Sequence, residues 1–363
     1  MASIKDVAKR AGVSISTVSN VINKSKYVSP ELTEKVNQAV LNMQYEADPV
    51  ARNMKTGKTK TIGIITADLC GLFYPYVIKG IYEIANLKGY SVTIFDTNTA
   101  YNQENVCVRE LECFKKLVSN RVDGIIFASA VPEKQAKEFL RDVREKACGY
   151  KQTPLVSIER DFSAHNIDSV FSDNVEGARK AVTHLLECGC ERICHIAGPK
   201  QAKMVQDRIE GYRSTMKEHN LDFAEEKMVQ YGDYTHQSGY IAMERLLRSN
   251  PRLDGVFVAN DQMAIGALKA LVSHGKRVPQ DVKIVGFDNV FISSMVEVPL
   301  STIHIRKRHM GLHAARRLFK KIEEEEMGHP QKEKAICEEL ETRLVVRRSS
   351  VFDATEDWIL SDW

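Results

Sequence analysis

The spacing of apolar residues divides this chain of 363 residues into two parts. Between Ile4 and Met43, apolar residues recur at the three- and four-residue intervals of amphipathic helices. From Thr61 onward, short apolar runs alternate with amphipathic helical stretches, an order that is typical of β-α-β units. The pattern therefore predicts an all-α head followed by a larger α/β core.

The head begins with two short helices and a tight turn, in the segment IKDVAKRAGVSISTVSNVIN. Gly12 ends the first helix, and Ser14 suits the N-cap of the second, with Thr17 at N3. The second helix turns two sets of side chains to opposite sides: Val18, Val21 and Ile22 inward, and Ser16, Ser19 and Asn20 outward, with Ile15 on the border. Small polar groups at the start of a second helix are typical of a helix-turn-helix in the DNA major groove. The alternative is an ordinary surface helical hairpin.

A third helix should complete the head, because Ser29 suits an N-cap and Pro30 suits N1. The segment 48–57 has the caps of a further helix of about two turns, with Asp48, Pro49 and Gly57 at its ends. A helix this short is marginal alone in water because nucleation is costly. We expect it to form only when another surface packs on it.

Eight short apolar runs predict the core strands, and they fall into two series of similar length. They are TIGIITAD, SVTIFDT, DGIIFAS and PLVSIE, followed by RICHIAG, KMVQYGD, DGVFVAND and VKIVGFD. Two such series predict two doubly wound parallel sheets. Ligands of such sheets bind beyond the carboxyl ends of the strands.

Polar and aromatic side chains gather at these predicted strand ends. They are Asp68 with Phe73 and Tyr74, Glu159 with Arg160, Asp173, Asn260 with Asp261, and Asp288. An aromatic face with carboxylate, amide and guanidinium groups suits a sugar, and the same set could hold a purine. Structural roles are the alternative, including an internal ion pair between Glu159 and Arg160.

Charge is unevenly distributed along the chain. Residues 1–60 hold ten Lys and Arg against five Asp and Glu, a net charge of +5, whereas the remainder holds 41 against 43. A basic head on a near-neutral body predicts a nucleic-acid partner for the head. Cys188, Cys190, Cys194 and His195 cluster in sequence, but neighbouring residues of a strand face opposite ways and the paired spacing of a zinc site is missing. We expect no metal and no cofactor.

Several motifs resemble the lactose-repressor and galactose-repressor (LacI/GalR) family of bacterial transcription regulators. They are AGVSISTVSNVIN, VARNMKTGKTKTIGII, NDQMAIGAL, VPQDVKIVGFDN and PLSTI, and the resemblance covers residues 2 to about 347. It implies a helix-turn-helix domain at 1–47, a hinge helix and linker at 48–60, and a periplasmic-binding-protein-like core at 61–348. Lobe one of that core would comprise about 61–171 and 304–331, and lobe two about 173–301 and 332–348. The acidic tail at 349–363, with both tryptophans, lies outside the resemblance and either docks or is disordered.

The resemblance also implies roles for individual residues. DNA contacts fall on Ser14, Ile15, Ser16, Thr17, Asn20 and Asn23 in the head and on Val50, Ala51 and Met54 in the hinge, where Met54 would wedge between base pairs of the minor groove. In the cleft, Arg208, Tyr234 and Asp288 occupy the positions of an effector-contacting arginine, a stacking aromatic and a cleft aspartate.

We therefore expect a cytoplasmic, homodimeric regulator, most often a repressor in this family, that binds a pseudo-palindromic operator and responds to a small molecule, for which we expect a sugar. The first alternative is a global regulator controlled by a phosphocarrier protein that docks on lobe one. An enzyme is disfavoured because the chain has no nucleophile elbow, phosphate loop or metal pair. A secreted sugar-binding protein and a membrane protein are disfavoured because the sequence shows neither a leader nor a spanning apolar run.

Asn20 should read an adenine, because an asparagine amide makes a bidentate pair with adenine N6 and N7. Asn20→Ala should weaken binding to the best operator by about 1–3 kcal/mol and relax the preference at one base pair of each half-site. Binding to a series of single-base operator variants checks this. An unchanged base preference in Asn20→Ala would refute the assignment.

Overall fold

The computed structural model describes residues 2–23, 26–45, 58–99, 104–148, 153–327 and 334–355. Contacts divide the chain into a head unit, Met1–Thr59, and a core unit, Lys60–Trp363. The predicted hinge helix at 48–57 and residues 356–363 of the predicted tail lie outside the described residues. Every helix of the described ranges is too short or too polar to span a bilayer.

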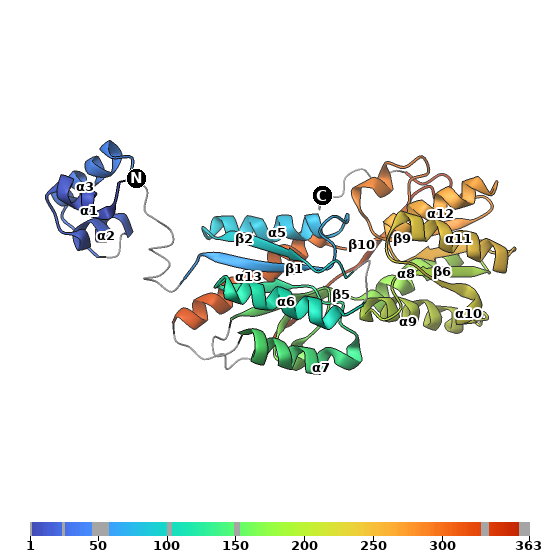
Figure 1. Ribbon diagram of the computed structural model, residues 1–363. Helices are drawn as coiled ribbons and strands as arrows, with labels where there is room; N and C mark the ends of the chain where they lie inside the picture. The colour runs from blue at the N-terminus through green and yellow to red at the C-terminus, as the bar shows by residue number, and fades with distance from the viewer. Residues whose placement is uncertain are drawn as a thin grey trace. The chain divides into compact units, whose positions relative to one another are not determined.

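The head consists of α1 (Ile4–Ala11), α2 (Ile15–Asn23) and α3 (Pro30–Asn42) (Figure 1). Gly12, with φ +65°, ends α1 as predicted. The Ser14 hydroxyl accepts a hydrogen bond from the Thr17 N–H at 3.1 Å, so Ser14 caps α2 as predicted. Ser29 precedes α3, but its side chain makes no capping hydrogen bond.

One valine from each helix forms the centre of the head. Val7, Val18 and Val36 are fully buried in one cluster, in which Ala8 and Ala39 are also buried. These residues lie on the apolar stripes that the sequence predicts. The outward face of α2 is therefore left for other contacts.

Lobe one of the core is a six-stranded parallel sheet in the order β11-β5-β4-β3-β1-β2. Helices α5 and α13 pack together on one face, and α6 and α7 lie on the other (Figure 1). Its elements are β1 (Thr61–Thr66), α5 (Tyr74–Leu87), β2 (Ser91–Asp96), α6 (Val106–Ser119), β3 (Gly124–Phe127), α7 (Glu133–Asp142), η1 (Val143–Cys148), β4 (Leu155–Ile158), η2 (Ser163–His165), β5 (Asp168–Ser172), α13 (Lys307–Glu326) and β11 (Cys337–Leu340).

Lobe two is a second six-stranded sheet, in the order β12-β10-β9-β8-β6-β7, and only β12 runs antiparallel to its neighbour. Helices α11 and α12 pack on one face and α8 and α9 on the other (Figure 1). Its elements are α8 (Asn174–Glu187), β6 (Ile193–Ala197), α9 (Lys203–Glu218), α10 (Glu225–Met228), β7 (Val229–Tyr231), α11 (His236–Ser249), β8 (Gly255–Val258), α12 (Asp261–Ser273), β9 (Lys283–Asp288), η3 (Phe291–Ser294), β10 (Ser301–His304) and β12 (Arg343–Val345). The two doubly wound sheets are thus confirmed.

The chain crosses between the lobes after β5, after β10 and between β11 and β12. Two predicted lobe boundaries are wrong. His304 pairs with Asp288 at the end of β10, so it belongs to lobe two and not to lobe one. Residues 337–340 pair with β5 in lobe one, whereas the sequence places 332–348 wholly in lobe two. β11 gives little signal because it is an edge strand in which only Leu340 is buried.

The predicted start of the tail at residue 349 is also wrong. Ser349 is fully buried in lobe two. Its carbonyl oxygen accepts from the Ile284 N–H at 3.0 Å, and its hydroxyl donates to the Ile284 carbonyl oxygen at 2.7 Å. The core therefore continues past residue 348, because these bonds extend the hydrogen bonding of β9.

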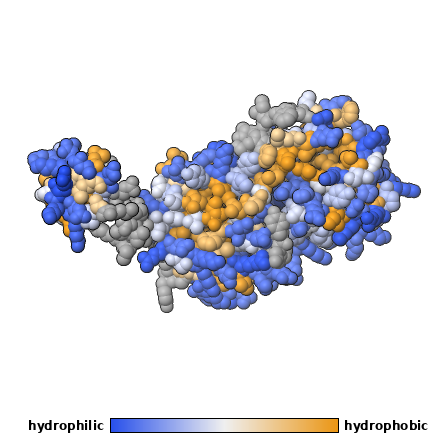
Figure 2. Space-filling model, turned by 45° about the horizontal axis from the view of Figure 1, so that its top comes forward, coloured by the Kyte–Doolittle hydropathy of each residue, from blue (hydrophilic) through white to orange (hydrophobic). Residues whose placement is uncertain are grey.

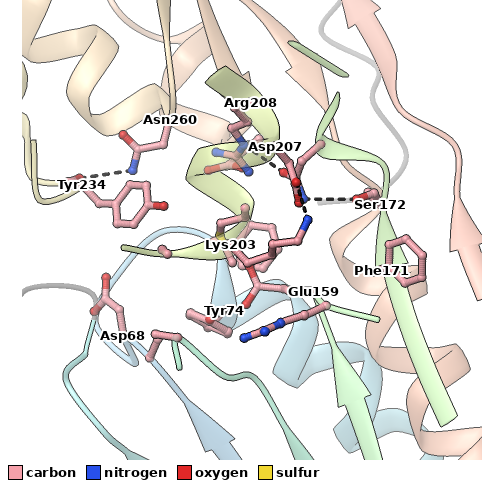
Figure 3. A pocket seen from close by; sticks show the side chains of 18 of the residues that line it. Asp68, Tyr74, Glu159, Phe171, Ser172, Lys203, Asp207, Arg208, Tyr234 and Asn260 are labelled. Atoms are coloured by element: carbon pink, nitrogen blue, oxygen red, sulfur yellow. Dashed lines mark hydrogen bonds and ion pairs between the residues drawn. The ribbon is translucent and has the colours of Figure 1, made fainter. Parts of the chain in front are cut away.

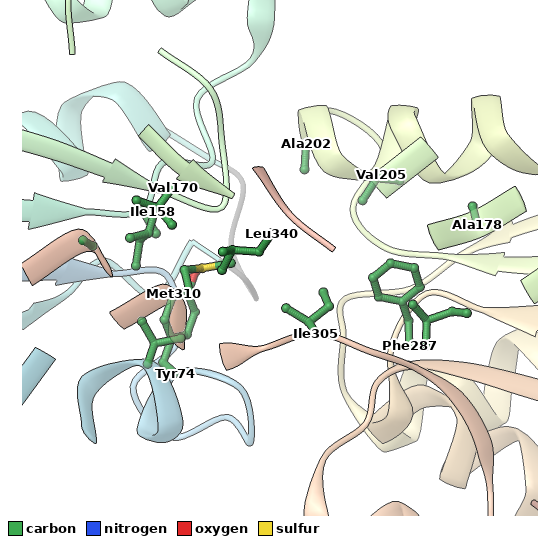
Figure 4. Close-up of a cluster of buried hydrophobic side chains, with 14 of the residues drawn as sticks. Tyr74, Ile158, Val170, Ala178, Ala202, Val205, Phe287, Ile305, Met310 and Leu340 are labelled. Atoms are coloured by element: carbon green, nitrogen blue, oxygen red, sulfur yellow. The ribbon is translucent and has the colours of Figure 1, made fainter. Parts of the chain in front are cut away.

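A cluster of buried apolar side chains runs through both lobes (Figure 4). Ile158 and Val170 lie in its lobe-one part, and Val205 and Phe287 in its lobe-two part. Ile305, at the second crossing, lies between them. The second crossing is therefore a packed segment of the core.

Close approach of α5 and α13 depends on glycine. A Cβ atom at Gly311 would collide with the carbonyl oxygen of Val77, which is backbone and cannot move aside. Gly311→Ala should therefore destabilise the core by about 3 kcal/mol. Gly89→Ala is the control, since a Cβ there meets open space and only the left-handed backbone, φ +70°, costs about 1 kcal/mol. Denaturant unfolding followed by circular dichroism measures both, and equal losses would contradict the argument.

Candidate functional site

A cavity of about 400 Å³ lies between the lobes, at the carboxyl ends of both sheets (Figure 3). Residues that follow β1, β3, β4 and β5 line it from lobe one, and residues that follow β7, β8 and β9 line it from lobe two. The structure brings nearly all the predicted cleft residues to this cavity: Phe73, Tyr74, Glu159, Arg160, Asp173, Arg208, Tyr234, Asn260 and Asp288, together with Asp68. In Figure 3, Tyr234 and Asn260 lie on one side and Phe171 and Ser172 on the other.

Arg208 projects from α9 and is only 5% exposed. Its Nε donates to Asn174 Oδ1 at 2.9 Å and its Nη1 donates to the Ala259 carbonyl oxygen, while the guanidinium carbon lies 3.7 Å from the centroid of the Phe287 ring. Nη2 is 4.0 Å from Asp288 Oδ1, beyond hydrogen-bond distance. Because its neighbours already fix the guanidinium, a ligand oxygen can bind it without ordering a free side chain.

Glu159 and Arg160 do not pair with each other, so the ion pair considered from the sequence is wrong. The Tyr74 hydroxyl donates to the Glu159 carboxylate. Arg160 Nη2 donates to Glu133 at 2.6 Å, and its Nη1 donates to the Val131 carbonyl oxygen. Burial, together with the nearby Asp288 carboxylate, raises the pKa of Glu159 to about 7. Glu159 is therefore a weakly acidic group held against Tyr74.

Asp261 is the predicted cleft residue that does not line the cavity. It is fully buried, and its carboxylate accepts from the Thr302 hydroxyl at 2.6 Å and from the Val290 N–H at 2.8 Å. The first residue of α12 turns its side chain back toward β9 and β10, whereas the preceding N-cap residue, Asn260, faces the cavity. Burial, with the charge of Asp288, raises the pKa of Asp261 to about 7. Asp261 therefore positions the loop after β9.

Three cavity residues other than glycine have left-handed backbone conformations. The φ angles are +65° at Glu159, +69° at Tyr234 and +99° at Asp288. Such conformations cost on the order of 1–3 kcal/mol each and persist only where the surrounding structure imposes them. Their gathering around one cavity supports a functional role for it.

Tyr234 and Asn260 are joined across the lobe-two wall. Asn260 accepts from the Met263 N–H at 2.8 Å and donates to the Tyr234 carbonyl oxygen at 3.2 Å, so its amide is largely committed to the fold. Asp173 likewise caps α8 through the Val175 and Glu176 N–H groups. The Tyr234 hydroxyl, in contrast, is buried with no hydrogen-bond partner among the described residues, and the same holds for the Ser172 hydroxyl.

Lys203 and Asp207 form an ion pair on α9 that lines the cavity, and neither is among the residues predicted from the sequence. Both share the motif KMVQDR with Arg208, but their offsets of one and five residues from Arg208 are not those of a single helix face, so helical spacing from Arg208 gives no signal for them. The sequence also did not predict Ser129 and Ala130, which line the cavity after β3 and bond to the buried Glu110 carboxylate. Burial raises the pKa of Glu110 to about 7.

The candidate nucleic-acid interface is the outward face of α2. Ile15 is 45% exposed and Ser14 and Ser16 are exposed, while Thr17 and Asn20 are half-buried. The Ser14 hydroxyl bonds to both the Ser16 and Thr17 hydroxyls, at 2.7 and 2.8 Å. The Asn23 side chain and residues Val50, Ala51 and Met54 lie outside the described residues.

Cys194 and His195 face different surroundings in β6, as the sequence predicts. His195 is fully buried, stacks on the Phe257 ring at 4.5 Å and hydrogen-bonds the Phe257 carbonyl oxygen. Cys194 lies in a separate apolar cluster with Val256 and Ile284. Adjacent residues on opposite faces of a strand cannot converge on one metal ion.

Comparison with known proteins places these features in a family. Residues 3–48 match the bacterial regulatory proteins of the lacI family, and residues 182–350 match the periplasmic binding protein-like domain. The chain is 32% identical to the ribose operon repressor of Halalkalibacterium halodurans, over 96% of this chain and 97% of that one. It is 34% identical to the HTH-type transcriptional repressor PurR of Pasteurella multocida, over 96% and 98%. A solved structure, the lac repressor dimer bound to operator and the anti-inducer ONPF, matches with a TM-score of 0.82 and 26% identity, over 96% and 99%.

The raised pKa of Glu159 predicts a pH-dependent stability. Between its ordinary pKa of 4.5 and about 7, the folded protein keeps a proton that the unfolded chain releases, so stability is lost as pH rises through this window. Glu159→Gln removes this loss of stability. The unfolding temperature of the variant, minus that of wild type, should therefore increase as pH rises. Thermal melts across the window check this, with Glu138→Gln, a 73% exposed residue, as the control. A difference from wild type that stays constant with pH would contradict the prediction.

Proposed function

Because the chain belongs to the LacI family of bacterial regulatory proteins, and is a sequence-specific DNA-binding transcription regulator, we propose that a small sugar in the cavity controls its binding to a pseudo-palindromic operator. The observation that carries this proposal is the cavity itself, whose polar walls come from both lobes. A ligand that touches both lobes can favour one angle between them over another.

The composition of the cavity supports a sugar. The rings of Phe73 and Tyr234 offer faces for the apolar C–H groups of a sugar ring, and Arg208 and Asp288 offer a donor and an acceptor for its hydroxyls. A volume of about 400 Å³ lies within the range of small-molecule sites. The relative that is a ribose operon repressor supports the same class of effector.

Operator recognition is assigned to α2. Ser14, Ser16, Thr17 and Asn23 would contact phosphates or bases, and Ile15, Ser16 and Asn20 would face base edges. Val50, Ala51 and Met54 would contact the minor groove. The excess of basic residues in the first sixty residues supplies the attraction to phosphate.

A homodimer would present two such heads to the two half-sites of an operator. The lac repressor bound to operator is a dimer. Figure 2 shows apolar side chains gathered over both lobes of the core. Exposed apolar side chains include Leu87 on α5, Val272 on α12 and Met295 after η3, at 82%, 64% and 64% exposure. A second copy of the chain would cover surface of this kind.

We assign the protein no catalytic role and place its action in the cytoplasm, where the bacterial chromosome lies. The family consists of regulators that act through DNA, and every function proposed for the cavity is binding.

We infer that Lys307 transmits ligand binding to the angle between the lobes. This lysine is the first residue of α13 in lobe one and is 1% exposed. Its Nζ donates to the carbonyl oxygens of Asp288 at 2.5 Å and Asn289 at 3.2 Å in lobe two. A ligand that moves Asp288 would therefore move the second crossing. In a dimer, the altered lobe angle would change the spacing of the two segments at 48–57.

Measurements of operator affinity with and without a panel of sugars and nucleobases test the proposal. The operators are recovered by in vitro selection, and affinity is measured by fluorescence anisotropy at fixed salt. Fixed salt is needed because phosphate contacts make affinity steeply salt-dependent. We expect one sugar to shift operator affinity by roughly 5- to 150-fold. Asp288→Asn should abolish the shift while leaving ligand-free operator binding intact, because asparagine tolerates the left-handed backbone. Tight operator binding that no compound moves would overturn control by a small molecule and favour a protein partner.

A further inference from the structure

The lining of the cavity is strongly acidic. It contains seven carboxylic acids and three basic side chains. The acids come from both lobes, so no orientation of a ligand avoids them. Charges in a partly enclosed cavity act on a ligand more strongly than charges on an open surface, because less water screens them.

The three basic side chains already face acids. Arg160 donates to Glu133 at 2.6 Å, and Lys203 pairs with Asp207 on the same helix. The Arg208 guanidinium lies 4.0 Å from Asp288. A phosphate or carboxylate on a ligand would therefore meet an acid beside each cation, including Arg208, whose Nη2 is not hydrogen-bonded to Asp288.

Other carboxylates of the lining use neutral donors. Asp161 accepts from the Ser163 N–H at 2.7 Å, and Asp173 accepts from two N–H groups at the start of α8. Glu159 accepts from the Tyr74 hydroxyl. At about pH 8, above the pKa of about 7 of Glu159, these groups add negative charge to the cavity without a matching cation from the lining.

Two neutral hydroxyl groups of the cavity lining lack a hydrogen-bond partner among the described residues. They are the buried hydroxyls of Tyr234 and Ser172, and they belong to side chains on opposite sides of the cavity in Figure 3. A buried hydroxyl without a partner is costly, and ligand hydroxyls that reached each of these two walls would satisfy them. Hydroxyls of an uncharged ring both donate and accept, so they match these groups and the surrounding carboxylates.

We propose that the cavity selects an uncharged, polyhydroxylated sugar and rejects the phosphorylated form of the same sugar. This inference rests on the proposed function, and it names the class of effector that the same site takes. Asp161, Asp173 and Asp207 supply the rejection, and the Tyr234 and Ser172 hydroxyls supply bonds to the uncharged ring.

Isothermal titration of the full-length protein tests the selection with matched pairs: ribose and ribose 5-phosphate, and glucose and glucose 6-phosphate. The titration is made at about pH 8, above the pKa values of about 7 for Glu159 and about 6 for Asp288, so that both are ionised. We expect the uncharged sugar of the better pair to bind at least about 100-fold more tightly, the factor that a few kcal/mol of like-charge repulsion gives. Equal or tighter binding of the phosphate would overturn the inference and leave sugar control standing. If no sugar of either kind binds, the proposed function fails, and the inference fails with it.

Asp207→Asn sharpens the test. It removes one acid and leaves Lys203 without its ion-pair partner, so the phosphorylated sugar should gain at least about tenfold relative to the uncharged one. Glu210→Gln is the matched control, because Glu210 lies on the same helix, pairs with Arg213 and does not line the cavity. An unchanged preference in Asp207→Asn would count against the proposal.

Tyr234→Phe separates the hydroxyl from the ring. It should weaken binding of the uncharged sugar about tenfold while circular dichroism and the unfolding temperature remain those of wild type, since this hydroxyl bonds to no residue that the structure describes. If Tyr234→Phe binds the uncharged sugar as tightly as wild type does, the Tyr234 hydroxyl does not bond to the ligand, and that part of the proposal is contradicted.

Discussion

The chain passes between its two lobes three times, after β5, after β10 and after β11, and the site depends on this threading. Each crossing leaves from the end of a strand, so the carboxyl ends of two parallel sheets are held toward each other. Loops that are hundreds of residues apart, such as those containing Asp68 and Asp288, thereby line one cavity. A single doubly wound sheet would offer only half of these walls.

Much of the fold follows from the sequence because buried parallel strands are continuous apolar runs, as in β1 and β8. The same rule fails for β11, whose residues are mostly polar because it lies at a sheet edge, and so the third crossing is misplaced. Strand-end reasoning locates Glu159 and Asp288 at the cavity, and the family resemblance locates Tyr234 there. Strand-end reasoning does not distinguish Asn260 from Asp261. These residues are the N-cap and the first residue of α12, and a shift of one position at the helix start decides which side chain faces the cavity.

Side-chain partners were the least predictable feature. Glu159 and Arg160 are adjacent and oppositely charged, yet each binds a residue from a different element, Tyr74 and Glu133. Lys307 lies in a stretch of basic residues, yet the structure buries it against carbonyl oxygens of the neighbouring lobe. Such choices depend on tertiary packing, which local sequence spacing does not contain.

The left-handed backbone at Glu159, Tyr234 and Asp288 has a consequence for how this protein tolerates change. Glycine would relax each of these positions, so selection for heat resistance alone would favour losing the very side chains that line the cavity. The response to a ligand and the thermal stability of the fold therefore place opposite demands on the same three residues. A thermostabilised version of this regulator that kept its response would have to gain its stability elsewhere.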